Sequence, residues 1–91
     1  MAITVSIPTI LRPYTGDVKR VEASGGNLAE LIGDLEANHS GIGERLVADG
    51  ALHHFVNVYV NDEDVRFTGG LDTPLSDGDE VTILPAVAGG R

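Results

Sequence analysis

Two adjacent glycines, Gly89 and Gly90, are the residues of this sequence whose chemistry is most informative. They follow Pro85 after a stretch without periodic apolar residues, and Arg91 comes after them. Six residues beyond Pro85 can extend roughly 20 Å. Because glycine has no Cβ, such a thread can enter a narrow active-site channel of another enzyme. We expect residues 1–85 to fold and residues 86–91 to form a flexible tail; a frayed terminus with chance glycines is the alternative.

The other polar groups favour structural roles. His53 and His54 are adjacent, so on a strand they would point to opposite faces and could not share a metal in the usual way. His39 stands near the predicted end of a helix, where its charge would suit the helix dipole. The acidic run 62–64 lacks the glycine and distant glutamate of a calcium loop and reads as a turn. The sequence therefore predicts no metal site and no catalytic residue of its own.

Composition narrows the classes of partner. The 91 residues contain 6 Lys+Arg and 14 Asp+Glu, for a net charge of −8, which disfavours nucleic acid and suggests a partner with a basic docking surface. No cysteine is present, so disulfides and thiolate chemistry are excluded. Neither a signal peptide nor an apolar run of membrane-spanning length is visible, and we expect a cytoplasmic protein without a membrane partner.

The first half of the sequence predicts a hairpin and a helix. Residues 3–7 alternate as a half-buried strand does, residues 13–17 read as a turn, and residues 18–23 give a second strand. Asn27 is a good helix N-cap and Glu30 follows three residues later, so an amphipathic helix is predicted over 28–38. An irregular passage follows, with three apolar residues expected to pin it to the core: Ile42, Leu46 and Val47.

The second half predicts strands. Residues 55–60 alternate most clearly, residues 61–64 read as a turn, and residues 65–67 as a short return strand. A tight turn over 76–79, with Gly78 at positive φ, leads into a last strand that Pro85 ends. This order predicts an α+β fold of the β-grasp (ubiquitin-like) type: a mixed four- to five-stranded sheet with one main helix packed on one face.

Strand parity also predicts a docking surface. If Val56, Val58 and Val60 face the helix, Phe55 and Tyr59 face outward. Leu84 faces outward by the same argument, on the strand that leads into the tail. An apolar patch beside a tail is typical of an interface, although ordinary exposed apolar surface is the alternative.

The run Asp-Gly-Asp-x-Val-x-Ile-x-Pro-x-Val-x-Gly-Gly over residues 77–90 resembles the MoaD/ThiS family of ubiquitin-like sulfur carriers. Residues 5–12, 34–38 and 60–66 resemble an actinobacterial branch of that family, so the resemblance covers essentially the whole chain. It implies a carrier rather than an enzyme, with no bound cofactor. An E1-like (MoeB/ThiF-type) enzyme would use ATP to adenylate the glycine carboxylate, and a sulfur donor would convert the adenylate to a thiocarboxylate.

In this branch, the resemblance implies that the thiocarboxylate attacks an aminoacrylate held by a PLP-dependent cysteine synthase, and that a JAMM-type zinc metalloprotease releases cysteine. Matched to this sequence, Gly90 would carry the sulfur and Gly89 would let the tail thread. Leu84 and Val87 would contact partners, together with Phe55 and Tyr59 from strand parity. A monomer is the simplest expectation.

One residue departs from the family pattern. Carriers of this branch end at the second glycine, whereas here Arg91 follows Gly90. Either Arg91 is trimmed first, with Gly90 and Arg91 forming a processing site for the same kind of metalloprotease, or it is an added residue; we favour the precursor. Three other functions stay open: a protein modifier joined to lysines, the small subunit of molybdopterin synthase, and a binding module with an inert tail.

Overall fold

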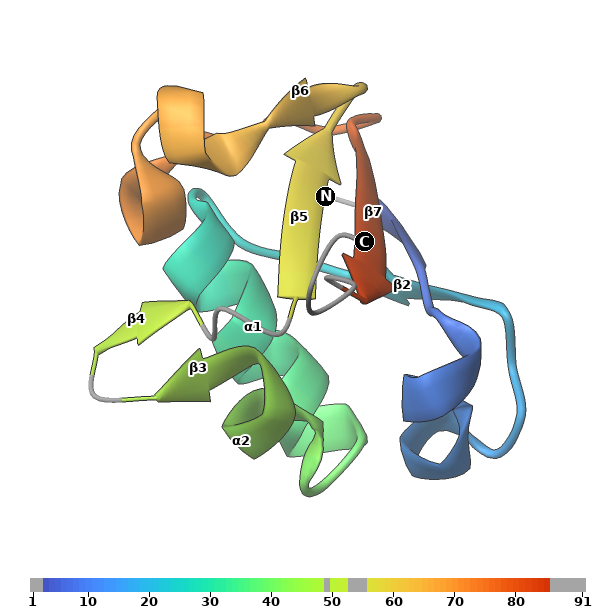
Figure 1. Ribbon diagram of the computed structural model, residues 1–91. Helices are drawn as coiled ribbons and strands as arrows, with labels where there is room; N and C mark the ends of the chain where they lie inside the picture. Colours follow the sequence, from blue (N-terminus) through green and yellow to red (C-terminus); the bar gives the residue numbers. More distant parts are fainter. Residues whose placement is uncertain (1–2, 49, 53–55, 86–91) are drawn as a thin grey trace.

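The computed structural model describes residues 3–48, 50–52 and 56–85, and within them a mixed five-stranded sheet is the central element (Figure 1). The strand order is β2-β1-β7-β5-β6. β7 lies in the middle, parallel to β1 and antiparallel to β5. The predicted β-grasp fold is confirmed. The strands are β1 (Ile3–Ser6), β2 (Arg20–Ala23), β5 (Val56–Val60), β6 (Glu63–Asp64) and β7 (Glu80–Pro85).

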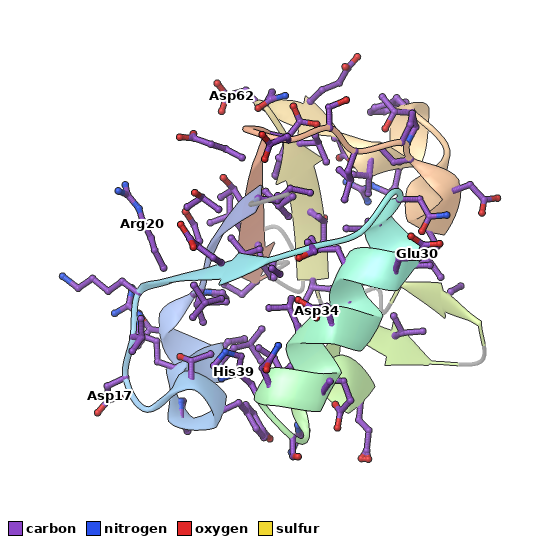
Figure 2. All side chains as sticks on the ribbon, turned by 180° about the vertical axis from the view of Figure 1, so that it is seen from behind. Asp17, Arg20, Glu30, Asp34, His39 and Asp62 are labelled. Carbon is purple, nitrogen blue, oxygen red and sulfur yellow. The ribbon has the colours of Figure 1, made fainter. Side chains whose placement is uncertain are left out.

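Helix α1 (Leu28–Asn38) has the predicted bounds and covers one face of the sheet. It lies behind β5 and β7 in Figure 1 and in front of the sheet in Figure 2. The Asn27 side chain accepts a hydrogen bond from the Glu30 N–H at 2.9 Å, as predicted. The Glu30 carboxylate accepts from the Gly26 N–H at 2.8 Å, one residue earlier than in a standard capping box. Both bonds satisfy amides that the helix cannot pair itself.

The core lies between α1 and the sheet. The largest fully buried side chains are Ile3, Val5, Leu28, Leu31, Leu35, Ile42, Leu46, Val58, Val65 and Val81. In α1 the buried side chains recur three or four residues apart, and in the strands they recur at every second residue, as the sequence pattern predicted. No described helix has the length and hydropathy needed to cross a bilayer.

Two local predictions were wrong. The link between β1 and β2 is a 3-10 helix, η1 (Thr9–Thr15), and β2 begins at Arg20 rather than at Val18, which is 46% exposed. The turn itself follows η1, with Gly16 and Asp17 at positive φ. Residues 65–67 form a second 3-10 helix, η2 (Val65–Phe67), instead of a strand, because the Asp64 side chain accepts from the Arg66 N–H and starts a helical turn.

The passage after α1 is more regular than the sequence predicted. It forms α2 (Ile42–Leu46) and a separate two-stranded sheet of β3 (Val47–Ala48) and β4 (Ala51–Leu52). Ile42 and Leu46 are buried, and Val47 packs partly buried against the core, as expected. A further 3-10 helix, η3 (Gly70–Asp72), lies in the loop before β7.

Candidate docking face and carrier segment

The face of the sheet turned away from α1 carries the residues that strand parity selected. Val81 and Ile83 are buried, so Thr82 and Leu84 of β7 point to the opposite face. Leu84 is 44% exposed. Tyr59 lies half-buried on the same face, directly opposite Thr82 in the ladder between β5 and β7. The outward orientation of both residues is therefore confirmed, while their role in docking stays a prediction.

The ladder register brings Tyr59 and Leu84 close to each other. Tyr59 pairs with Thr82, and Leu84 pairs with Asn57, so the two side chains are diagonal neighbours on one face. Diagonal neighbours in antiparallel ladders lie roughly 7–8 Å apart, within reach of an aromatic ring. The remaining predicted site residues lie outside the described residues, as do two of the three histidines: Phe55, Val87, Gly89, Gly90, Arg91, His53 and His54.

Beside this pair, a shallow hollow of about 460 Å³ lies at the carboxyl end of β7. Leu84 and Pro85 line it from β7, and Ile10 lines it from η1. Its basic residues are Arg12, Lys19 and Arg20. Arg20 projects away from the body of the molecule in Figure 2. Sequence reasoning missed this hollow, although the clustering of three of the six basic residues within positions 12–20 was a visible signal.

Near the amino end of β7, acidic side chains accept hydrogen bonds that stabilise the local backbone. The Ser76 N–H and the Asn61 side-chain amide donate to the Asp79 carboxylate at 2.8 and 3.0 Å, and they lower the pKa of Asp79. Asp64 forms a 2.7 Å ion pair with Arg66, whose hydrogen bonds lower the pKa of Asp64. Within residues 3–48, 50–52 and 56–85, no three potential metal ligands cluster. Asp62 lies in the predicted turn, whereas Glu63 and Asp64 form strand β6, so the turn predicted over 61–64 is shorter than expected.

Glu36 has a comparable structural role at the end of α1. Its carboxylate accepts hydrogen bonds from the Gly41 N–H at 3.0 Å and the Gly43 N–H at 2.7 Å, and these two bonds lower the pKa of Glu36. A Cβ at Gly43 would meet the Glu36 carboxylate at 2.8 Å, so the loop fits closely around the anion. His39 is the C-cap of α1, and its backbone N–H donates to the Leu35 carbonyl.

Comparisons with known proteins show the family to which this chain belongs. The model of the ThiS family matches residues 5–90. The chain belongs to the ThiS family. It is 68% identical over 93 residues to the sulfur carrier protein CysO of Mycobacterium tuberculosis, across 99% of this chain and 100% of that protein. The crystal structure of that CysO superposes with a TM-score of 0.91 at 67% identity, over 93% of this chain and 99% of the other.

A second solved structure resembles the chain equally well. In the complex of BexX with CysO from Amycolatopsis orientalis, the similar chain is 63% identical with a TM-score of 0.93, covering 98% of this chain and 100% of that one. Together these relatives support a sulfur-carrier role and a carrier rather than an enzyme. The family match ends at Gly90, so Arg91 lies outside it, as the motif comparison predicted.

Proposed function

We propose that this protein is a sulfur carrier whose Gly90 carboxylate is adenylated by an E1-like enzyme and converted to a thiocarboxylate. The observation that carries the proposal is the family match over residues 5–90, which spans the folded domain and ends on the second glycine. The identity of 68% to a CysO carrier over 99% of the chain supports the same role. The thiocarboxylate would then donate its sulfur in cysteine biosynthesis or a related sulfur-transfer pathway.

The chemistry divides between the carrier and its partner. A carboxylate is a poor electrophile, so a Gly90 oxygen first attacks the α-phosphorus of ATP, with release of pyrophosphate. A sulfur nucleophile from the donor then attacks the acyl carbon and displaces AMP. The carrier supplies the terminal carboxylate and a docking face. ATP and the sulfur donor are substrates of the partner enzyme.

Arg91 must leave before this chemistry can start. Arg91 follows Gly90 in the sequence, so the Gly90 carbonyl is part of a peptide bond and not a free carboxylate. Hydrolysis between Gly90 and Arg91 would expose the glycine carboxylate, and we assign this step to a JAMM-type zinc metalloprotease. The same class of protease would release cysteine after transfer to a PLP-dependent cysteine synthase. The complex of a similar carrier with BexX supports work through protein partners.

The deciding experiment compares two forms of the chain with the E1-like enzyme of the same organism. ATP–pyrophosphate exchange is measured for residues 1–91 and for residues 1–90. We expect exchange with the shorter form alone, and intact mass after addition of sulfide should show one oxygen replaced by sulfur. A chain ending at Gly89 is the matched control for tail length. Equal exchange by the 1–91 and 1–90 forms would contradict the trimming step.

Further observations on the same protein distinguish the sulfur carrier from the three alternative functions. Lysine-linked adducts of the chain in its host would indicate a protein modifier. Stable co-purification with a larger subunit would indicate the small subunit of molybdopterin synthase. Full function after deletion of residues 89–91 would indicate a binding module whose tail is inert.

A further inference from the structure

The hollow at the carboxyl end of β7 is basic, although the chain as a whole carries a net charge of −8. Arg12, Lys19 and Arg20 line it, and none of the described residues that line it is acidic. The Arg12 Nε donates to the Ile7 carbonyl at 3.3 Å, and this bond anchors the side chain just beyond β1. Within the part of the chain that the structure describes, the ion pair joins β6 to η2, so no carboxylate neutralises the three cations of the hollow.

The hollow also carries exposed apolar surface. Among the described residues, four large hydrophobic side chains are exposed, and two of them, Ile10 at 58% and Leu84 at 44%, line the hollow. Pro8 and Pro85 add further apolar surface. An anion that follows a few small apolar residues along its chain would match both properties. The basic side chains would bind its charge, and its apolar carbons would cover Ile10 and Leu84.

The chain itself carries such a segment next to the hollow. Residues 86–90 read Ala-Val-Ala-Gly-Gly, and removal of Arg91 would leave a carboxylate on Gly90. The segment continues directly from Pro85, which lines the hollow. Five extended residues span at most about 18 Å, so the carboxylate stays within that distance of Pro85. The tether gives it a high effective concentration there, and the entropic cost of closing a loop rises only with the logarithm of its length.

The register of the sheet directs the chain beyond β7 toward the basic residues. Ser6 lies opposite Thr82 in the parallel ladder, and the same offset matches Pro85 with Thr9, where η1 begins. Figure 1 shows η1 beside the carboxyl end of β7. Strand β2, which supplies Arg20, lies on the far side of β1 from β7. A chain that turns from β7 toward β1 therefore passes η1 on its way to the cations.

We propose that, once Arg91 is removed, the hollow binds residues 86–90 of the same chain, with the Gly90 carboxylate among the three basic side chains. The apolar side chains of residues 86–88 then cover Ile10 and Leu84. This inference rests on the proposed function for the removal of Arg91, and it adds where the terminus lies between encounters with partners. Every partner that acts at Gly90 must draw the segment out of the hollow, so docking lowers the reactivity of the terminus outside such complexes.

The hollow should distinguish the trimmed chain from the untrimmed one. In a chain that keeps Arg91, a guanidinium stands next to Gly90, and the three cations of the hollow repel it. Removal of Arg91 takes this positive charge away and leaves the carboxylate on the glycine. The docked state is therefore a property of the processed carrier.

Nuclear magnetic resonance of the chain ending at Gly90 tests the docking. Backbone amide shifts are compared between the free acid and the same chain with a C-terminal amide, which keeps the length and removes the charge. Beyond residues 86–90, we expect differences at four residues of the hollow: Ile10, Lys19, Arg20 and Leu84. High salt should reduce these differences by at least about twofold. A chain that keeps Arg91 should give smaller acid–amide differences at the same residues.

Two double variants supply the matched control. Lys19→Gln with Arg20→Gln removes two cations of the hollow. Arg45→Gln with Arg66→Gln removes two cations that do not line it. We expect the first pair to reduce the acid–amide differences in η1 and at the end of β7 by at least about twofold, and the second pair to leave them unchanged.

Three results would overturn the docking. The first is a set of differences confined to residues 86–90, or equal in the two double variants. The second is differences that grow with protein concentration, which would assign the segment to the hollow of a second copy. The third is differences at Leu52 and Leu71, which line the cavity between β4, β5 and η3. None of these measurements uses the adenylating enzyme, so their failure leaves the proposed function intact, whereas failed pyrophosphate exchange by the 1–90 form counts against the proposed function alone.

Discussion

The loop around Glu36 and the hollow around Lys19 and Arg20 both concentrate charge, but they use it in opposite ways. The partly buried Glu36 carboxylate accepts hydrogen bonds from the amides of Gly41 and Gly43. Lys19 and Arg20 are exposed, and the ion pair found within the described residues joins Asp64 and Arg66 instead. The charge of Glu36 is thus bonded to its own loop, whereas the charges of Lys19 and Arg20 face solvent.

The difference separates stability from recognition. A carboxylate bound by its own backbone fixes a loop, and its loss is felt by the whole domain. An exposed cation contributes little to folding because water solvates it well. Changes near Glu36 should therefore lower stability, and changes at the hollow should alter binding. The predictions below test this division, beginning with the largest expected effect.

Truncation of a large apolar side chain should separate the two regions most clearly. Leu46 in α2 is fully buried next to the Glu36 loop, so Leu46→Ala should lower the free energy of unfolding by about 2–5 kcal/mol. Ile10 at the hollow is 58% exposed, and Ile10→Ala should change it by less than about 0.5 kcal/mol. Urea denaturation of both variants measures the contrast. Similar losses in the two variants would show that the hollow is part of the core.

Glycines at positive φ should give the next largest contrast. Gly41 has φ +98°, and a Cβ there would meet the Tyr14 ring at 3.0 Å, so Gly41→Ala should cost about 2–3 kcal/mol. Gly16, in the turn after η1, has φ +65° with nothing within 4 Å of its Cβ position. Gly16→Ala should cost about 1 kcal/mol, because backbone strain acts alone. Thermal unfolding of both variants checks the order, which a larger loss for Gly16→Ala would reverse.

Acidification should reduce the contribution that the loop around Glu36 makes to the stability of the fold. Hydrogen bonds from Gly41 and Gly43 lower the pKa of Glu36 in the folded state, so ionised Glu36 adds stability above the ordinary value of 4.5. This contribution is lost as the pH falls through the lowered value. The Glu36→Gln variant should therefore have a lower free energy of unfolding than the parent at neutral pH. On acidification, the free energy of unfolding of the variant should fall less than that of the parent. Glu44→Gln, an exposed change of equal charge, is the control; the same pH slope in parent and Glu36 variant would refute the assignment.

Neutralising the hollow should have the smallest effect on folding. Lys19→Gln with Arg20→Gln should change the free energy of unfolding by less than about 0.5 kcal/mol, because exposed charges contribute little. Denaturation at low and high salt measures this directly. A loss well above that size would mean that these cations stabilise the fold, and it would remove the contrast with Glu36.

Sequence reasoning succeeded where the signals are local. The bounds of α1 follow from Asn27, Glu30 and an apolar stripe that lie within one short segment. The orientations of Val81, Ile83 and Leu84 follow from simple alternation. The stretch 65–67 was assigned wrongly because three residues cannot show a period, and the capping by Asp64 decided the outcome. β3 and β4 have two residues each and carry no period either.

The cluster of basic residues at positions 12–20 is visible in the sequence, but the hollow that they line could not be predicted, because its parts are distant in sequence. It combines residues from 6–20 with residues from 82–85, and only the parallel pairing of β1 with β7 brings them together. That pairing depends on the packing of the whole domain. The tail, residues 86–91, is the reverse case, because a motif over residues 77–90 indicated its role through the family resemblance, whereas physical patterning alone favoured a frayed terminus.

The parallel pairing of β1 with β7 also bears on how the protein acquires its fold during synthesis. The first strand of the sheet finds its central neighbour only when residues 80–85 have been made. Until then β1 has β2 alone, and β5 lacks the strand that joins it to the rest of the sheet. Pairings of such long sequence separation close slowly. Nascent chains should therefore remain open to chaperones and proteases until translation has passed β7.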